Sequence, residues 1–344
     1  MYSVGQLGAY LPRWIAHELP QASHIELTHL RRAGGGSSTE NWLFDAGWNI
    51  GTMRVARPMV LRCAPRSEVV VAARADEFHL LRAIEGHGLL SPAAFWLDAS
   101  GHWLGRPAML LEQCAGKADR KLLTPANTLE LKPEQQAVLA CDIADALAAI
   151  HRLDVRVVVA LPRAAAVGLD PARREIGLQE LSQSRAATSA SPEMRLAYAW
   201  LREHVPRRPA REVLVHGDFR PANILVEQGR VTAVLDWELA HVGDPMEDLG
   251  WYLAPVYRQE HFMGDAWTPA DFIRRYENRS GIAVDHEAVR FWTVFALYKL
   301  CAIASSTMVA FVSGDHARLA PFPYGLLESL MRAIAYPEPR SVAA

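Results

Sequence analysis

The chain has 344 residues, of which 50% are hydrophobic and 22% charged, and its formal net charge is −2. A chain of this size and composition predicts one large folded domain, or two lobes with a cleft between them. Because no polybasic surface is indicated, nucleic acid and anionic membrane are not expected as main partners.

Short apolar runs in the first third of the chain predict a strand-rich lobe that one helix interrupts. The helix is expected over residues 68–85, where Phe78, Leu81 and Ile84 recur at helical spacing and neither Gly nor Pro occurs. The predicted strands cover residues 25–30, 41–46, 59–63, 93–97 and 108–111.

Residues 34–39 read Gly-Gly-Gly-Ser-Ser-Thr and lie between the first two predicted strands. Glycines allow backbone amides to approach an anion such as phosphate closely. A glycine-rich hairpin turn explains the same residues. The segment 34–39 is not a Walker-type loop, because no Gly-Lys-Ser/Thr follows.

Beyond Gly116 the pattern becomes helical. Residues 133–152 carry an apolar stripe, and the serine-containing stretch 179–192 is expected to connect two helices. A hinge near residues 112–116 gives a first lobe over residues 1–112 and a second lobe over residues 113–344.

A polar loop in the second lobe carries the strongest chemical signal. It reads His216-Gly-Asp218-Phe-Arg-Pro-Ala-Asn223, lies among short buried strands, and is followed by Asp236 at a strand end. Asp218 is suited to orient a hydroxyl group and accept its proton, while Asn223 and Asp236 offer hard oxygen ligands for a divalent metal. The plain alternative is that Asp218 caps a turn, Asn223 fixes a loop and Asp236 is an ordinary exposed acid at a strand end.

The order His-x-Asp-x-x-x-x-Asn, strand, Asp resembles the catalytic and metal-binding loops of the protein-kinase-like superfamily. With Gly217, Leu-Asp-Trp-Glu at 235–238 and Gly-Asp-Pro at 243–245, it is similar to the aminoglycoside phosphotransferase family. Within that family it most resembles the kinase domains related to those fused to acyl-CoA dehydrogenases. These kinase domains usually have a Leu-Arg pair in the first lobe and a His at a helix end, and this chain has Leu61-Arg62 and His151. The resemblance covers roughly residues 25–336.

This resemblance implies an α+β, two-lobed protein-kinase-like fold, with a small antiparallel-sheet N-lobe and a mostly helical C-lobe, and ATP and Mg²⁺ as cofactors. Arg62 would neutralise phosphate charge and pair with Glu77, in a position where most kinases have Lys. His216 would hold the catalytic loop around Asp218. The remaining nucleotide-binding residues would be Gly35, Gly36, Ser37, Ser38 and the hinge backbone at Glu112 and Cys114.

The implied function is transfer of a γ-phosphoryl group to a small-molecule hydroxyl, on a hydroxyacyl thioester or another metabolic alcohol. Two alternatives remain: an aminoglycoside or macrolide resistance kinase, and a nucleotide-binding pseudokinase that acts as an interaction module. An aminoglycoside site would be expected to carry more acids than Glu260, Asp265 and Asp271 in the segment 251–276. The sequence gives no indication of the oligomeric state.

Residues 291–311 form an apolar run long enough to cross a bilayer, with Lys299 as its only charge. We interpret it as a core helix, because Lys299 and Ser305-Ser306-Thr307 interrupt it. Four widely separated cysteines predict reduced thiols rather than disulfides or a zinc site. An N-terminus without a basic region and apolar run predicts a cytoplasmic protein.

Overall fold

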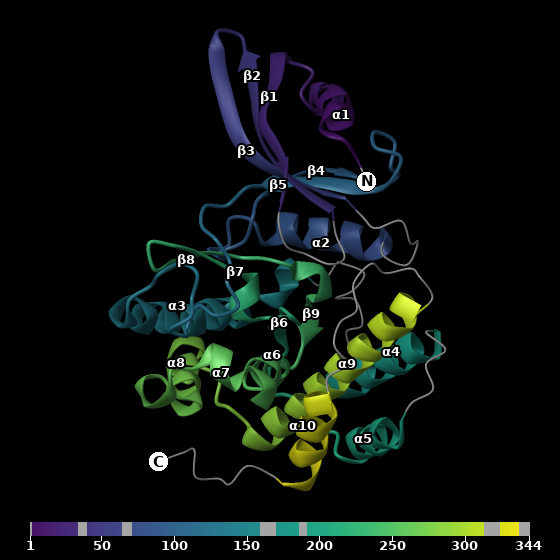
Figure 1. Cartoon of the computed structure of the whole chain (residues 1–344), viewed down its shortest axis with the longest axis vertical. Coiled ribbons are helices and arrows are strands. Elements are labelled where there is room, and N and C mark those ends of the chain that lie inside the picture. Colours follow the sequence, from purple (N-terminus) through teal and green to yellow (C-terminus); the bar gives the residue numbers. More distant parts are fainter. Residues whose placement is uncertain are drawn as a thin grey trace. The chain divides into compact units, whose positions relative to one another are not determined.

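A computed structural model describes residues 2–33, 40–63, 71–158, 170–185, 191–312 and 324–336. The chain divides into two compact units. Unit 1 comprises Met1–Lys117, Leu225–Gln228 and Thr232–Leu239, and unit 2 comprises Ala118–Ile224, Gly229–Val231 and Ala240–Ala344. The sheet of unit 1 and the many helices of unit 2 make the fold α+β (Figure 1).

Unit 1 is built on a five-stranded antiparallel sheet with the order β1-β2-β3-β5-β4. Along β2, burial alternates between Trp42, Phe44 and Ala46 on one face and the less buried Leu43 and Asp45 on the other. All five predicted strands are present, and the first three extend further than expected. They are β1 (Ala22–Arg32), β2 (Glu40–Ile50), β3 (Met53–Cys63), β4 (Ala94–Asp98) and β5 (Ala108–Glu112).

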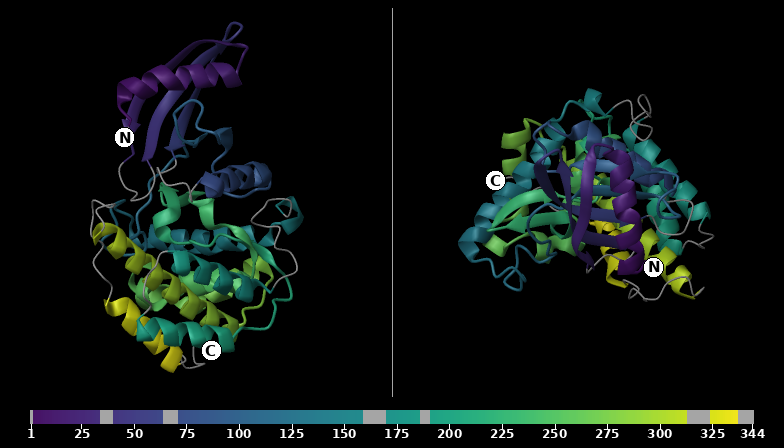
Figure 2. Two further views of the ribbon diagram at one scale, coloured as in Figure 1. Left: turned by 90° about the vertical axis from the view of Figure 1, so that its right-hand side faces the viewer. Right: turned by 90° about the horizontal axis from the view of Figure 1, so that it is seen from above.

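An N-terminal helix, α1 (Val4–Glu18), covers one face of this sheet (Figure 2). Its first turn is closed by a capping box between Ser3 and Gln6. The sequence analysis predicted no element here, although the capping box precedes apolar residues at helical spacing. Burying each of these side chains stabilises the fold by about 1.5–3 kcal/mol. They are Leu7, Leu11, Trp14 and Ile15, all fully buried.

The helix expected over residues 68–85 is α2 (Val71–Ile84). Phe78, Leu81 and Ile84 are buried, as the spacing predicted, and the acidic Glu77 is buried with them. A buried carboxylate requires a cationic partner, and that partner proves to be part of the candidate site.

Most of a hairpin from the second half of the sequence belongs to unit 1. The hairpin consists of β7 (Ile224–Glu227) and β8 (Arg230–Val234). Val226 exchanges backbone hydrogen bonds of 3.0 Å with Lys117, and the Thr232 hydroxyl donates to the Ala115 carbonyl at 2.6 Å. These bonds explain why residues 225–228 and 232–239 belong with the sheet.

Unit 2 is mainly helical and includes the small antiparallel pair of β6 (Val213–Val215) and β9 (His241–Gly243). The predicted helix over residues 133–152 is confirmed. The predicted connection over residues 179–192 is wrong for its first part, because the helix formers of residues 175–181 outweigh the serines and α4 continues to Arg185. The helices are α3 (Pro133–Arg152), α4 (Pro171–Arg185), α5 (Pro192–Glu203), α6 (Pro245–Tyr252), α7 (Arg258–His261), α8 (Pro269–Ser280), α9 (His286–Val312) and α10 (Tyr324–Ala335).

The long apolar helix α9 packs against α6. Among the described residues, the stretch His286–Ser306 is long and apolar enough to cross a membrane, and 61% of its apolar window is buried in the structure. A core helix of a soluble protein meets the same criterion, so this stretch is weak evidence for a membrane span. The burial supports the core-helix interpretation.

The close approach of α6 and α9 depends on Gly250. A Cβ atom at this position would lie 2.6 Å from the backbone of Trp292. Gly250→Ala is therefore expected to destabilise the protein by about 1–3 kcal/mol through overpacking, measured as a lower midpoint of thermal unfolding. Gly177→Ala is the matched control, since Gly177 lies in α4 with no atom within 4 Å of the added Cβ. It should leave stability unchanged or raise it by about 0.5–1 kcal/mol. Equal destabilisation by both changes would contradict the packing argument.

Candidate active site

The predicted base, Asp218, lies on the loop that follows β6 in unit 2. The amide Nδ2 of Asn223 donates to the Asp218 backbone carbonyl at 2.9 Å and to its carboxylate at 2.8 Å. The Asp218 side chain is 14% exposed. The two residues that the sequence placed five positions apart are thus in direct contact, and the Asp218 side chain is not completely buried, although its Oδ1 atom is.

A buried carboxylate, Asp248 on α6, fixes the loop before Asp218. It accepts the backbone N–H groups of His216 at 2.7 Å and Gly217 at 2.9 Å. It also accepts the Nε2–H of His151 at 3.0 Å. Gly217 has a φ of 81°, in the left-handed region that glycine tolerates best. Asp248 therefore holds a tight backbone turn directly before the predicted base.

The charge of Asp248 is stabilised by these donors. Burial opposes its ionisation, but hydrogen bonds from His151 and the His216 backbone outweigh that effect and hold the pKa of Asp248 below its ordinary value. The Tyr276 hydroxyl lies 2.7 Å from Nδ1 of His151 and orients the ring from the other side. In the sequence, His151 stood out only as the end of a helix.

His216 is fully buried, and its Nδ1 accepts the backbone N–H of Asp218 at 3.2 Å. An accepting Nδ1 carries no proton. This arrangement fits the predicted role of His216 in holding the loop.

Arg220 is a neighbour of Asp218 that the sequence analysis did not single out. Its Nε lies 3.0 Å from Oδ1 of Asp218, and its side chain is 36% exposed. In the sequence, only its position two residues after Asp218 pointed to Arg220. In a loop, such closeness in sequence does not determine whether two side chains meet.

Asn223 also offers a ligand atom. Among the described residues, both hydrogen bonds of its side chain use Nδ2, which leaves the hard oxygen Oδ1 for a cation. Asp236, the other predicted metal ligand, belongs to unit 1.

In unit 1, Arg62 bridges two acidic side chains. Its guanidinium donates to Glu77 at 2.7 Å and to Asp236 at 3.0 Å. The Glu77 side chain is completely buried, whereas that of Asp236 is 36% exposed. Burial acts to lower the pKa of Arg62, but the charges of Glu77 and Asp236 outweigh it and raise the pKa. The pairing of Arg62 with Glu77 is as predicted, and Asp236 is an additional partner.

Asp236 has a backbone φ of 67°. This left-handed conformation is uncommon for a residue other than glycine, and Asp tolerates it better than most residues. It turns the chain sharply at the end of β8. The exposed part of the carboxylate could hold a metal, since carboxylate oxygens suit Mg²⁺.

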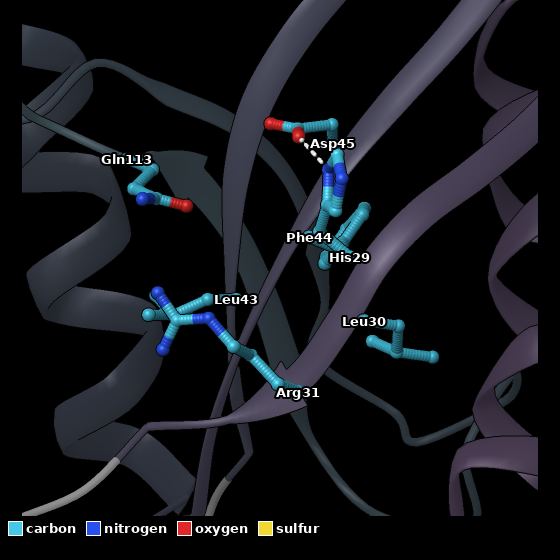
Figure 3. Close-up of a pocket in the computed structure, with 7 residues that line it drawn as sticks. All are labelled: His29, Leu30, Arg31, Leu43, Phe44, Asp45 and Gln113. Carbon is cyan, nitrogen blue, oxygen red and sulfur yellow. Dashed lines mark hydrogen bonds and ion pairs between the residues drawn. The ribbon is translucent and has the colours of Figure 1, made fainter.

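A pocket of about 480 Å³ lies on unit 1, beside the predicted hinge (Figure 3). Its wall includes an ion pair of 2.7 Å between His29 and Asp45. Its volume falls in the range of small-molecule sites. The lining residues are His29, Leu30, Arg31, Leu43, Phe44, Asp45 and Gln113.

The hinge backbone is only partly used within unit 1. The N–H of Glu112 donates to Ala93 and that of Gln113 to Pro58, so Glu112 could offer a ligand only its carbonyl. Within the described residues, the N–H of Cys114 has no protein acceptor. Burial, assisted by the Glu112 charge, raises the pKa of the Cys114 thiol to about 11, which keeps it protonated at neutral pH.

The predicted phosphate-binding residues Gly35, Gly36, Ser37 and Ser38 lie outside the described residues, and their role stays a prediction.

The aromatic side chains of the segment 251–276, which follows Asp248, lie mostly in the core. The Tyr252 ring stacks on the rings of His261 and Phe272, with centroids 4.4 and 4.3 Å apart. The face of Trp251 instead lies 5.3 Å from the ammonium of Lys299.

Comparison with known proteins places this geometry in context. The model of the phosphotransferase enzyme family (APH) matches residues 29–292. Acyl-CoA dehydrogenase family member 10 of Mus musculus is 28% identical over 313 residues, which cover 85% of this chain but only 28% of that protein. The chain thus spans less than a third of that relative's length.

Solved structures with low sequence identity share the fold. Macrolide 2'-phosphotransferase MphH from Brachybacterium faecium has a TM-score of 0.56 at 22% identity, covering 96% of this chain and 99% of that one. A ternary complex of aminoglycoside phosphotransferase APH(4)-Ia with AMP-PNP and hygromycin B has a TM-score of 0.62 at 18% identity, covering 95% and 99%. These likenesses establish a protein-kinase-like fold.

Removing the charge of Asp248 should loosen the loop before Asp218. In Asp248→Asn one acceptor oxygen replaces two, so at least one of the three donors loses its partner, at a cost of about 1–3 kcal/mol. We expect amide exchange at His216 and Gly217 to accelerate about 10- to 100-fold, measured by hydrogen–deuterium exchange of peptides spanning residues 213–223.

Asp145→Asn is the matched control, because Asp145 pairs with Arg275 and Arg279 and not with the loop. Unchanged exchange in Asp248→Asn would contradict the assigned role. Since the pKa of Asp248 is lowered by folding, its stabilising effect should be present above the ordinary carboxylate pKa of about 4 and be lost as the pH falls through the lower folded-state value.

Proposed function

Because the chain belongs to the phosphotransferase enzyme family, we propose that it transfers the γ-phosphoryl group of ATP to a hydroxyl group of a small molecule. The acceptor oxygen forms a bond to the γ-phosphorus while the bond from that phosphorus to the bridging oxygen of the β-phosphate breaks, and ADP leaves. The hydroxyl proton passes to a carboxylate base.

The observation that carries this proposal is the state of Asp218. Its carboxylate is oriented by Asn223 at 2.8 Å and lies on a loop that Asp248 fixes through two backbone N–H groups. Its side chain is 14% exposed, although the Oδ1 atom itself is buried. A base that is fixed in direction and not completely buried meets the geometric requirement for orienting and deprotonating a hydroxyl group.

Unit 1 supplies groups suited to a nucleotide. Arg62 is a permanently charged donor, and its Nη atoms are positioned by Glu77 and Asp236. The pocket beside Gln113 and the N–H of Cys114 suit the purine end. Bound Mg²⁺ would neutralise charge on the β- and γ-phosphates, and Asn223 Oδ1 and the Asp236 carboxylate are the oxygen ligands that would hold it.

For the acceptor, we favour a hydroxyacyl thioester or another metabolic alcohol. The similarity to acyl-CoA dehydrogenase family member 10 supports this choice. An aminoglycoside is a polycation and would need acidic side chains that are free to bind it. Two of the three acids in the segment 251–276 already have partners within the protein. Glu260 lies 3.3 Å from Arg120, and Asp271 completes the capping box of α8 with Thr268 and pairs with Arg274.

A coupled ADP-release assay with Mg²⁺-ATP tests the proposal. The acceptor panel includes hydroxyacyl-CoAs, amino alcohols, sugars, aminoglycosides and macrolides. Asp218→Asn should lower transfer by about 10²- to 10⁴-fold, because the base acts in the chemical step. It should leave ATP affinity unchanged, because the base acts on the acceptor and not on ATP.

The pattern of signals distinguishes the alternatives. Asp218-dependent transfer to an antibiotic alone would favour a resistance kinase. ATP binding without transfer to any acceptor would favour the pseudokinase, and equal loss of transfer and ATP affinity in Asp218→Asn would refute its assignment as the base.

A separate prediction concerns Asp236. Asp236→Ala should abolish the gain in ATP affinity that Mg²⁺ gives the wild-type protein, because one of the two oxygen ligands is removed. Titrations with and without Mg²⁺ measure this gain. Glu26→Ala is the control, since Glu26 is an exposed acid of unit 1 that pairs with Arg54. An unchanged Mg²⁺ effect in Asp236→Ala would exclude Asp236 as a ligand.

A further inference from the structure

Lys299 is a solitary charge on the core helix α9. It is the only Asp, Glu, Lys or Arg between Phe291 and Ser306. Its side chain is partly buried, whereas most of its neighbours along the helix are fully buried. A cation in such surroundings is unfavourable unless something compensates its charge.

The protein compensates this charge only weakly. The ammonium lies 3.5 Å from the Gly217 carbonyl, at the long limit of a hydrogen bond, and 5.3 Å from the centre of the Trp251 ring. In the described part of the chain, no carboxylate oxygen lies within ion-pair distance of Lys299. An ammonium has three N–H donors, so most of its hydrogen-bonding capacity is left for another molecule.

Two acids of unit 2, Glu175 and Glu247, attract Lys299 electrostatically beyond ion-pair distance, but both have nearer partners. Glu175 pairs with Arg174 at 3.0 Å. Burial raises the pKa of Glu247, and His241 contacts its carboxyl at 3.2 Å. Although Glu175, His241 and Glu247 could together surround a metal, Arg174 already neutralises Glu175. This cluster therefore balances its own charge and leaves that of Lys299 uncompensated.

Lys299 also lies beside the loop that carries the proposed base. Its nearest acceptor, Gly217, directly precedes Asp218 in sequence. Arg220 adds a second cation, with Nε 3.0 Å from the Asp218 carboxylate and a side chain that is 36% exposed. A ligand whose hydroxyl reaches Asp218 would thus meet positive charge close to its reacting oxygen.

We infer that Lys299 binds an anionic group, a carboxylate or a phosphate ester, that lies a few bonds from the reactive hydroxyl of the acceptor. This inference rests on the proposed function and narrows its substrate class to anionic alcohols. It favours a free hydroxy acid or a phosphorylated alcohol over a hydroxyacyl thioester, whose carboxyl group carries no charge. Lys299 then determines specificity, because a neutral alcohol would leave the ammonium without its partner and a polycation would be repelled.

Acceptor pairs that differ only in charge test this role. Suitable pairs are 3-hydroxybutyrate with 3-hydroxybutyramide and glycerol 3-phosphate with glycerol, assayed with saturating Mg²⁺-ATP. In Lys299→Met, KM for the preferred anionic member should rise about 10- to 100-fold, the effect of losing one hydrogen bond to a charged group. Lys299→Arg, which keeps the charge, should restore most of the affinity. The two pairs distinguish a carboxylate from a phosphate.

The neutral members and ATP provide the internal control. Their KM values should not change in Lys299→Met, and the exposed Lys132→Met should alter none of the values. Equal loss for the charged and neutral members, or a raised KM for ATP, would overturn the inference and indicate that Lys299 only supports the loop. Asp218-dependent transfer would then still support the kinase.

Equilibrium binding of the same four compounds keeps the inference testable if none of them is phosphorylated. Calorimetric titration in the presence of an unreactive ATP analogue should show tighter binding of the anionic members to the wild-type protein, and this preference should vanish in Lys299→Met. Equal affinity for both members of each pair in the wild-type protein would overturn the inference.

Discussion

The candidate active site depends on one buried carboxylate. Asp248 joins the backbone of His216 and Gly217 to the imidazole of His151, and through it to Tyr276. Backbone N–H groups in a buried turn must find acceptors, and an ionised carboxylate satisfies several at once. The position of Asp218 follows from this constraint, because the backbone directly before it is held, and Asn223 then orients its carboxylate.

In unit 1 a buried cation, Arg62, has the corresponding role, because its contacts with two acids fix the direction of its guanidinium. Arg62 is held between Glu77, which is fully buried, and Asp236, which is partly exposed. Removing one member of such a buried pair leaves an uncompensated charge and costs about 3–5 kcal/mol. The same ion pairs that stabilise the interior of unit 1 thus fix the direction of a cation suited to phosphate. Stability and binding geometry have one physical origin here, and a lysine would lack the planar fork that serves both acids.

The sequence predicted elements well where local periodicity was strong, as in the strands of unit 1 and the helix of residues 133–152. The prediction failed for two helical segments whose local signals are weaker, the N-terminal helix α1 and the C-terminal part of α4. The capping box at Ser3 was overlooked, and the serines near Arg185 were interpreted as a connection although α4 continues through them. α1 is stabilised by its capping box and by four fully buried apolar side chains. In α4 the helix formers of residues 178–181 contribute, and their effect becomes visible only when it is summed over a whole turn.

By itself the sequence determined the residue types of the site, their order and the family, because the spacing from His216 to Asn223 and on to Asp236 limits the chemistry that a short loop and hairpin can support. Only the tertiary structure decided which charges meet. The Arg62–Asp236 contact joins residues 174 positions apart and that of His151 with Asp248 spans 97. Lys299, which looked like an interruption in an apolar helix, lies beside the loop of Asp218. Such contacts follow from packing of helices and strands, and no local periodicity encodes them.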